Sequence, residues 1–354
     1  MISSAGNTSR LELRPYAADD FDAWQAYVRT CPSATVFHLL QWSRAVERAY
    51  GHRPWHLTAW CGGRLVGVLP LFLVKSLFVG RVLVSVPYAT YGGVLADSLQ
   101  IAEGLLELAK DLCRRYACSY LELRHRDSSG LDLPEFGRYD TFRKPLPERP
   151  EDVLASLPKK TRAAARNGLL ELGEGSAIIS AGLLDTIYDL YACTLRRLGS
   201  PNYRRGLFHA LQQEYGDDCV CIAIRDGPRY VAGVVSFIFR DEIVPYFSGS
   251  LPDGMAKRAN NVMYLRLMEY AVRRRLRLFD FNRTRRDNRG PYDFKRHHGF
   301  EPSPLHYQVF LNKAREMPNL TPGSRRFALA GRAWRRMPLW LTKRAGERIT
   351  KWIP

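Results

Sequence analysis

The chain has 354 residues, 46% hydrophobic and 25% charged, which is typical of a globular protein and excludes a disordered one. This length suits two domains plus a tail. No apolar run is long enough to span a membrane, and residues 1–14 lack the apolar core of a signal peptide, so we expect a cytoplasmic protein. Seven cysteines are scattered without a CxxC pair, which predicts reduced thiols and no metal site.

The net charge of +18 is concentrated in three segments. Residues 313–354 carry eleven Lys or Arg against two Glu, and residues 272–298 carry ten against three Asp. Residues 159–166 add four basic residues and no acid. Such clusters predict a polyanionic partner, which is a phosphate group, a nucleic acid or an anionic membrane surface.

The first half of the chain predicts two helices, then strand, strand, Gly-containing loop, helix and strand. The first strand contains Gly67 and is preceded by a Gly-Gly turn. In chain order the predicted elements are helices 19–29 and 41–49, strands 65–72 and 82–86, loop 87–97, helix 99–115 and strand 120–124.

The second half repeats this order, again with a glycine, Gly233, in the first strand. A proline-rich stretch near 145–150 separates the halves. The predicted elements are helices 159–172, 183–198 and 203–215, strands 231–237 and 243–247, loop 248–257, helix 260–274, and strands 278–281 and 305–311. A repeat of this length predicts a duplicated α/β domain, with boundaries at 1–148, 149–312 and a basic helical tail at 313–354.

Several phrases along the chain carry a family resemblance. Residues 281–300 hold Phe-Asn-Arg, a basic segment and Phe-Lys-x-x-x-Gly-Phe, and the phrases at 37–42, 51–54, 87–93 and 157–162 appear in matching order. Taken together they resemble FemAB-related proteins of the type encoded with exosortase/PEP-CTERM exopolysaccharide systems.

The resemblance implies two tandem GNAT-like (acyl-CoA N-acyltransferase) domains, each with a central mixed sheet and flanking helices. It also implies transfer of an acyl or aminoacyl group to an amine, in exopolysaccharide or cell-envelope synthesis. The donor in such proteins is acyl-CoA or aminoacyl-tRNA, and no cofactor is permanently bound. The acyl-CoA loop of GNAT enzymes has only partial substitutes here, at 91–93 and 259–261, which disfavours acyl-CoA.

The resemblance points to Lys295 as the leading catalytic group. A serine elbow of the G-x-S-x-G type is absent, so the amine is expected to attack the carbonyl directly. The Lys295 ammonium would then point into a cleft and stabilise the oxyanion, unless it is one more solvated cation. Asp280 either accepts a proton or pairs with an arginine, and Tyr292 and Asp293 are alternatives for the same role.

Substrate-binding residues are predicted in three places. Lys159, Lys160, Arg162 and Arg166 form a basic stripe on one predicted helix, suited to a phosphate group or else simply solvated. The loop residues Tyr88, Tyr91, Gly92 and Gly93 either shape a cleft in the first domain or pack within the loop. Asn282 and Arg283 follow the last strand of the repeat and complete the set.

The tail predicts amphipathic helices, with apolar residues recurring from Leu341 and, upstream, at Phe327, Ala330 and Trp334. Two interpretations stay open: peripheral contact with an anionic membrane at its inner face, or docking on the protein's own core. The alternative to a transferase is a non-catalytic scaffold or tRNA-binding protein. No DNA-binding motif is present in the sequence.

Overall fold

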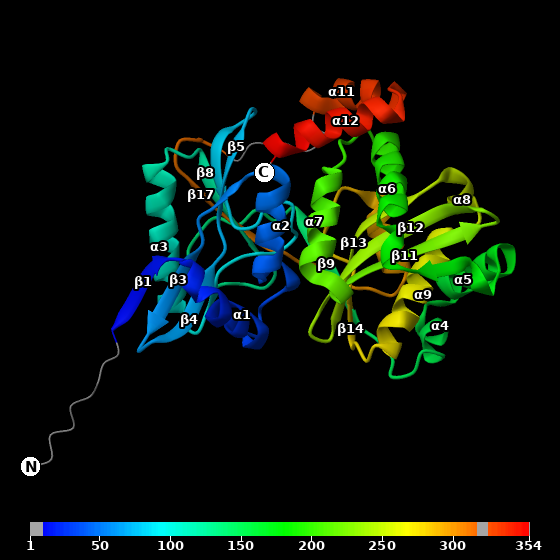
Figure 1. Cartoon of the computed structure of the whole chain (residues 1–354), viewed down its shortest axis with the longest axis horizontal. Helices are drawn as coiled ribbons and strands as arrows, with labels where there is room; N and C mark the ends of the chain where they lie inside the picture. The colour runs from blue at the N-terminus through cyan, green and yellow to red at the C-terminus, as the bar shows by residue number, and fades with distance from the viewer. Residues whose placement is uncertain (1–9, 317–324, 354) are drawn as a thin grey trace, which may run out of the picture.

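A computed structural model describes residues 10–316 and 325–353 and shows two lobes side by side, with a pair of helices across one end (Figure 1). The first lobe contains two sheets, with strand orders β1-β3-β4-β7 and β17-β8-β6-β5-β2. Its elements are β1 Leu11–Pro15, α1 Phe21–Thr30, α2 Leu40–Tyr50, β2 Arg53–Pro54, β3 Leu57–Cys61, β4 Arg64–Leu69, β5 Phe72–Ser76, β6 Gly80–Val84, β7 Leu95–Ala96, α3 Leu99–Arg115, β8 Tyr120–His125 and β17 His306–Leu311.

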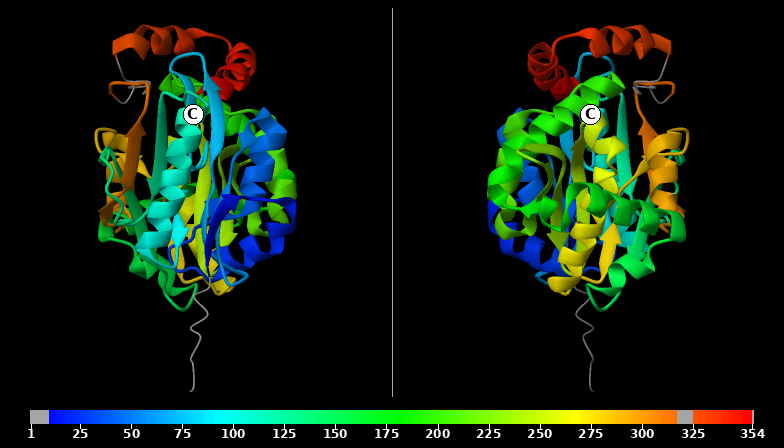
Figure 2. Two further views of the ribbon diagram at one scale, coloured as in Figure 1. Left: turned by 90° about the vertical axis from the view of Figure 1, so that its left-hand side faces the viewer. Right: turned by 90° about the vertical axis from the view of Figure 1, so that its right-hand side faces the viewer.

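The second lobe is built on a larger sheet, ordered β10-β11-β12-β13-β14-β9-β15, with β16 also paired to β9. Helices cover both of its faces (Figures 1 and 2). Its elements are β9 Tyr139–Pro145, α4 Asp152–Ser156, α5 Lys159–Leu172, β10 Ala177–Ile179, α6 Leu184–Leu198, α7 Arg205–Tyr215, β11 Cys219–Asp226, β12 Arg229–Phe239, β13 Glu242–Ser250, α8 Pro252–Ala256, α9 Ala259–Arg273, β14 Leu278–Asp280, β15 Thr284–Arg285, α10 Arg289–His297 and β16 Pro302–Pro304.

Glycines in the repeated strands let helices lie close to the sheets. A Cβ on Gly67 would lie 2.9 Å from Ile101 of α3, and one on Gly233 would lie 2.8 Å from Ile187 of α6. The predicted strand 65–72 is in fact two strands, β4 and β5, which belong to different sheets. Strand pairing is interrupted between them, at Pro70 and Leu71. The basic segment within residues 281–300 includes the helix α10, which spans Arg289–His297.

Strand membership does not follow the predicted boundaries at residues 148 and 312. β9 precedes the first boundary but pairs with β14 of the second lobe, at Asp280↔Arg143 among other positions. β17 precedes the tail but pairs with β8 of the first lobe, from His306↔His125 to Leu311↔Tyr120. The chain therefore crosses between the lobes and returns. β9 belongs to the second lobe although it lies before residue 148, and β17 belongs to the first lobe although it follows the second lobe in the sequence.

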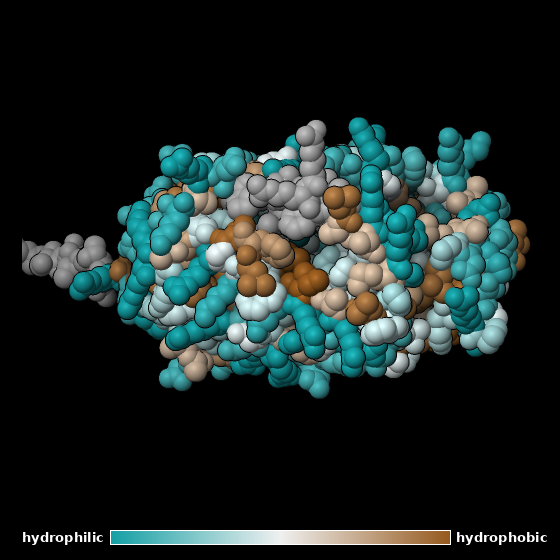
Figure 3. Space-filling view, turned by 90° about the horizontal axis from the view of Figure 1, so that it is seen from above, coloured by the Kyte–Doolittle hydropathy of each residue, from teal (hydrophilic) through white to brown (hydrophobic). Residues whose placement is uncertain are grey.

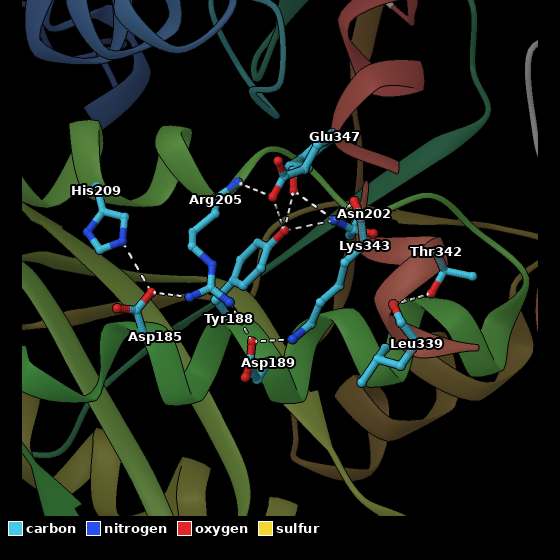
Figure 4. Close-up of polar contacts among 11 residues, drawn as sticks. Asp185, Tyr188, Asp189, Asn202, Arg205, His209, Leu339, Thr342, Lys343 and Glu347 are labelled. Atoms are coloured by element: carbon cyan, nitrogen blue, oxygen red, sulfur yellow. Dashed lines mark hydrogen bonds and ion pairs between the residues drawn. The ribbon is translucent and has the colours of Figure 1, made fainter. Parts of the chain in front are cut away.

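The tail docks on the second lobe through α11 (Arg325–Arg336) and α12 (Leu339–Ile349), as the second interpretation predicted. Figure 4 shows Tyr188 of α6 donating to the Glu347 carboxylate at 2.9 Å and Lys343 pairing with Asp189 at 2.6 Å. The backbone N–H of Arg205 also donates to Glu347, at 3.3 Å. Phe327, a predicted apolar position, lies in α11, but its side chain is outside the described structure.

The end of the tail, η6 (Thr350–Trp352), also contacts the first lobe. The Tyr88 hydroxyl donates to the Thr350 carbonyl at 3.1 Å, and the Tyr50 hydroxyl lies 3.2 Å from the Thr350 hydroxyl. The tail therefore links the two lobes. Within the described parts of the chain, no helix is both long and apolar enough to cross a bilayer.

Candidate functional site

Asp280 lies at the end of β14, where the two lobes meet, and its side chain is fully buried. Its carboxylate accepts hydrogen bonds from the Tyr91 hydroxyl of the first lobe at 2.9 Å and from the Asn282 backbone N–H at 2.7 Å. The Thr141 hydroxyl of β9 also donates to it, at 3.3 Å, and contacts the Tyr91 hydroxyl. The Arg143 guanidinium lies 3.7 Å away. The interpretation of Asp280 as an arginine-paired charge therefore matches this geometry.

Lys295 does not point into an open cleft. Its ammonium donates to the carbonyls of Phe281 at 2.5 Å, Asn282 at 2.9 Å and Arg283 at 3.3 Å, and its side chain is buried. These bonds hold the turn after β14, where Asn282 has a φ of +60°. Burial lowers the pKa of Lys295 to about 7, although the charge of Asp280 partly offsets this. The prediction of a cleft-facing amine is wrong, because α10 carries the ammonium back onto the backbone. Lys295 is a positioning residue for the Asp280 turn.

Tyr292 and Asp293 lie on α10 and contact other groups. The Tyr292 hydroxyl donates to Asp140 of β9 at 2.7 Å, and Asp140 also pairs with Arg286. Burial, followed by the bond to Asp140, raises the pKa of Tyr292. Within residues 10–316 and 325–353, the Asp293 side chain has no hydrogen bond or ion pair. The structure does not bring either residue to Asp280.

Glu242, which the sequence analysis missed, is the second buried carboxylate at this junction. It begins β13, and its carboxylate lies 3.3 Å from the same Arg143 guanidinium that approaches Asp280. Burial raises the pKa of Glu242 to about 7, and the charge of Asp280 adds to the effect. Two carboxylates thus share one arginine, and Glu242 can bind or release a proton near neutral pH. The sequence around Glu242 does not indicate this role, because the arginine that pairs with it lies far away in the sequence, on β9.

A pocket of about 230 Å³ lies in the first lobe, between β7 and the end of β8. It includes the N-terminus of α3, where the Ser98 hydroxyl accepts from the Ile101 backbone N–H at 3.3 Å. The Arg126 side chain is only 8% exposed and pairs with Asp127 at 3.0 Å. Gly93, which lines the pocket, lies two residues after Tyr91, whose hydroxyl bonds to Asp280, so the pocket lies close to the junction. The lining residues are Ser33, His38, Gly93, Val94, Leu95, Ala96, Ser98, Leu99, Ala102, His125, Arg126, Asp127, Ser128 and Ser129.

The loop predicted to shape a cleft contributes unequally to this pocket. Gly93 lines it, and a Cβ there would collide with the His125 ring at 2.0 Å. Tyr91 instead reaches Asp280, and Tyr88 bonds to His52 at 2.7 Å and to Thr350. Gly92 packs on Val86 with a φ of +149°, which favours glycine.

Asn282 and Arg283 diverge immediately after Asp280. The Asn282 amide donates to the Pro245 carbonyl at 2.8 Å and thereby joins the turn to β13. The Arg283 guanidinium turns toward the first lobe and donates to the Tyr307 hydroxyl at 2.9 Å. Of the two side chains, that of Arg283 reaches across the junction to the first lobe and brings a positive charge there.

The basic stripe lies on α5, on the side of the second lobe away from the first lobe (Figure 1). Lys159, Lys160 and Arg166 are exposed, and Arg162 is partly exposed. None of the four forms an ion pair within the described parts of the chain. The structure does not bring the stripe to the junction, and phosphate binding by it stays a prediction. No cluster of three or more potential metal ligands occurs in the described ranges.

Comparison with known proteins identifies the fold. Residues 155–296 match the family model described as an acetyltransferase (GNAT) domain. The structure of FemX is similar over 85% of this chain and 98% of its own, with a TM-score of 0.64 and 14% identity. A tandem GNAT protein from the clavulanic acid biosynthesis pathway covers 85% of this chain and 98% of its own, with a TM-score of 0.51 and 12% identity. The fold is that of tandem GNAT domains.

A third similar structure is the C-terminal domain of a protein described as a lysylphosphatidylglycerol synthetase from Agrobacterium fabrum. It covers 89% of this chain and 95% of its own, with a TM-score of 0.56 and 11% identity. No curated protein matches the sequence. At these identities the tandem GNAT structures establish the fold.

Proposed function

We propose that the chain is a FemAB-like N-acyltransferase that moves an acyl or aminoacyl group to an amine, in exopolysaccharide or cell-envelope synthesis. The observation that carries the proposal is the pair of buried carboxylates at the junction of two GNAT lobes. Amine attack requires loss of a proton near neutral pH, and Glu242, with a pKa of about 7, is suited to accept it. The similarity to FemX and to a tandem GNAT protein supports this class of chemistry.

In the proposed reaction the acceptor ammonium gives its proton to Glu242, and the free amine attacks the donor carbonyl. A C–N bond forms, and the C–S bond of a thioester or the C–O bond of an aminoacyl ester breaks. The nitrogen of the adduct gives its second surplus proton to the leaving thiolate or alkoxide, and Glu242 releases the first proton to solvent. Arg143 stabilises the ionised form of Glu242, the charge of Asp280 keeps its pKa raised, and Lys295 fixes the turn that carries Asp280. No covalent enzyme intermediate is required.

The donor is acyl-CoA or aminoacyl-tRNA, and the pocket at the α3 N-terminus is our candidate for its phosphate-bearing part. Backbone N–H groups at a helix N-terminus favour an anion, and the lining also includes Arg126, which pairs with Asp127 at 3.0 Å and retains further N–H donors. The pocket also lies near the buried carboxylates, because Gly93 in its lining follows Tyr91, whose hydroxyl bonds to Asp280, by two residues. A donor anchored there would present its acyl group toward the junction.

We further propose that the end of the molecule carrying the tail rests on an anionic membrane surface at the cytoplasmic face. The β5–β6 hairpin reaches this end beside α11 and α12 (Figures 1 and 2). Figure 3 looks onto this face and shows hydrophobic residues gathered near its middle among hydrophilic ones. The exposed apolar side chains on these elements are Leu77, Phe78, Leu329 and Trp340, and the exposed basic ones on the tail are Arg332, Arg335, Arg336, Arg344 and Arg348.

A donor screen tests the proposed function. The purified chain is incubated with acyl-CoAs or charged tRNAs and a panel of amines, and transfer is followed by thiol or tRNA release and by mass spectrometry of the acceptor. An N-acylated product that requires the protein is expected. Equal stabilisation by charged and uncharged tRNA without any product would instead favour the non-catalytic binding protein.

A further inference from the structure

Three arginines from different elements converge on a group of tyrosines between the lobes. Arg124 lies on β8, Arg204 directly precedes α7, and Arg283 follows β14. The Arg204 guanidinium lies 5.8 Å from the centre of the Tyr50 ring, which stacks on Tyr88 at 4.3 Å, and the Tyr88 ring lies 5.3 Å from that of Tyr203. In keeping with this arrangement, burial raises the pKa of Tyr203 and the charges of Arg283 and Arg124 offset part of that rise. The charges of Arg204 and Arg124 act in the same way on Tyr88. We call this set the arginine–tyrosine cluster; its tyrosines are Tyr50, Tyr88, Tyr139, Tyr203, Tyr246 and Tyr307.

The cluster holds more positive than negative charge. Arg124 pairs with Glu122 at 2.6 Å, and its guanidinium also donates to two backbone carbonyls. Arg283 and Arg204 have no carboxylate within 4 Å in residues 10–316 and 325–353. Burial pulls the pKa of Arg283 down, but the surrounding tyrosines outweigh this, so the guanidinium stays charged. A cation enclosed in protein without a counter-ion is costly, and proteins normally pair such charges.

The side chains around Arg283 are tyrosines, whose hydroxyls can donate as well as accept hydrogen bonds. Its guanidinium lies 4.7 Å from the centre of the Tyr139 ring and donates to the Tyr307 hydroxyl. The hydroxyls of Tyr139 and Tyr203 have no hydrogen-bond partner in the described parts of the chain, and both residues stay partly exposed, as does Arg283. Those of Tyr50 and Tyr88, by contrast, are bonded to Thr350. The Arg204 guanidinium donates to the Ala49 carbonyl at 2.6 Å, so Arg204 and Arg283 each hold a neutral acceptor but no carboxylate. Their remaining N–H groups and the two phenols can bind an incoming ligand.

We propose that the arginine–tyrosine cluster binds the phosphate group of a phosphate-bearing ligand. Two unpaired guanidiniums match the charge of a phosphate dianion better than that of a single carboxylate, and a guanidinium can bind two phosphate oxygens at once. Tyr139 and Tyr203 donate to the remaining oxygens. That the ligand is a substrate rests on the proposed function, and the binding itself does not. The cluster is separate from the pocket at α3 and from the stripe on α5.

Calorimetric titration of the full chain with pyrophosphate, inorganic phosphate and acetate tests this site. We expect pyrophosphate to bind and Arg283→Gln to weaken it roughly tenfold or more. Arg225→Gln, which removes an exposed cation of β11 that belongs to no proposed site, is the matched control and should bind as the wild type does. If Arg283→Gln fails to fold, as its melting curve would show, Tyr139→Phe and Arg204→Gln replace it, and each should weaken binding.

Unchanged binding in the folded cluster variants, or equal loss in Arg225→Gln, would overturn the proposal. Acetate binding as tightly as phosphate would overturn the phosphate assignment. Because the readout is binding alone, a chain without transferase activity that still binds pyrophosphate through Arg283 refutes the proposed function and keeps this site. An active transferase whose cluster variants bind normally does the reverse.

Discussion

The phenol of Tyr91 donates a hydrogen bond of 2.9 Å to the carboxylate of Asp280, across the junction of the two lobes. Both side chains are buried, so neither can replace its partner with bulk water. This bond therefore couples the loop before α3 to the turn after β14, and with it the pocket of the first lobe to the buried carboxylates of the second.

Tyr91→Phe removes that donor and leaves Asp280 with one hydrogen bond fewer. Loss of a partner to a buried charged group is expected to lower the free energy of unfolding by about 1–3 kcal/mol. Urea denaturation followed by tryptophan fluorescence measures this. Tyr270→Phe is the control, because within residues 10–316 and 325–353 its hydroxyl bonds only to the exposed Arg274 side chain. Equal stability of both variants would show that the bond contributes nothing.

Glu242 should make stability fall as pH rises toward neutrality. Its folded pKa of about 7 lies above its ordinary value of 4.5, because burial disfavours the charged form. The contribution is fully present below about pH 4.5 and is lost as pH rises through 7, on the order of 3 kcal/mol. We expect Glu242→Gln to lack this component, so the difference in unfolding free energy between wild type and variant should change across this window. A constant difference would contradict the shifted pKa.

The same carboxylate should govern the rate. As a base Glu242 acts only when ionised, so kcat/KM should rise with pH and level off above about pH 7. Glu242→Gln should lower the plateau by roughly 100- to 10,000-fold and remove the inflection. Asp253→Asn, at an exposed carboxylate of α8, is the control. If Glu242→Gln retained both the rate and the inflection, another group would be the base.

Lys295→Met should reduce both stability and turnover. Three carbonyls lose their donor, and the turn carrying Asp280 is expected to shift, which alone can cost roughly 100-fold in kcat/KM. Lys295→Arg should rescue poorly, because a planar guanidinium cannot replace a compact ammonium among three converging carbonyls. Melting temperature and kcat/KM are measured together, with Lys75→Met, at an exposed position of β5, as control. Normal melting with a large rate loss would favour a direct catalytic role instead.

Vesicle co-sedimentation tests the membrane face. Leu329→Asp and Trp340→Asp should each lower the fraction bound to anionic vesicles several-fold, because apolar insertion is lost and a repelled charge is added. Leu170→Asp, on an even more exposed leucine of α5, should behave as the wild type does. Point variants are preferable to removal of the tail, since truncation would uncover the α6 surface that α12 contacts. Equal pelleting of all forms, or pelleting with neutral vesicles alone, would contradict the proposal.

Local structure could be predicted from the sequence because it depends on local patterns. Helix 159–172 agrees with α5 at both ends, and 99–115 agrees with α3, since apolar spacing and Pro158 mark them. The exchange of β9 and β17 could not be predicted, because alternating residues do not indicate which sheet a strand joins. The sequence motif around Lys295 does not indicate where its side chain points, so the contact of the ammonium with three backbone carbonyls could not be predicted. Glu242 was missed because its pKa depends on Arg143 and Asp280, more than 30 residues away in both directions.

The exchange of strands also constrains the order in which the chain can fold during synthesis. β8 has β6 on one side and β17 on the other, and β17 is translated only after the entire second lobe. Until then the first lobe presents an unpaired β8 edge, which is prone to pair with other chains. The nascent first lobe thus remains incomplete while about half of the protein is synthesised. A fragment ending at residue 148 should therefore aggregate, whereas one extended through Leu311 contains every strand of the two first-lobe sheets.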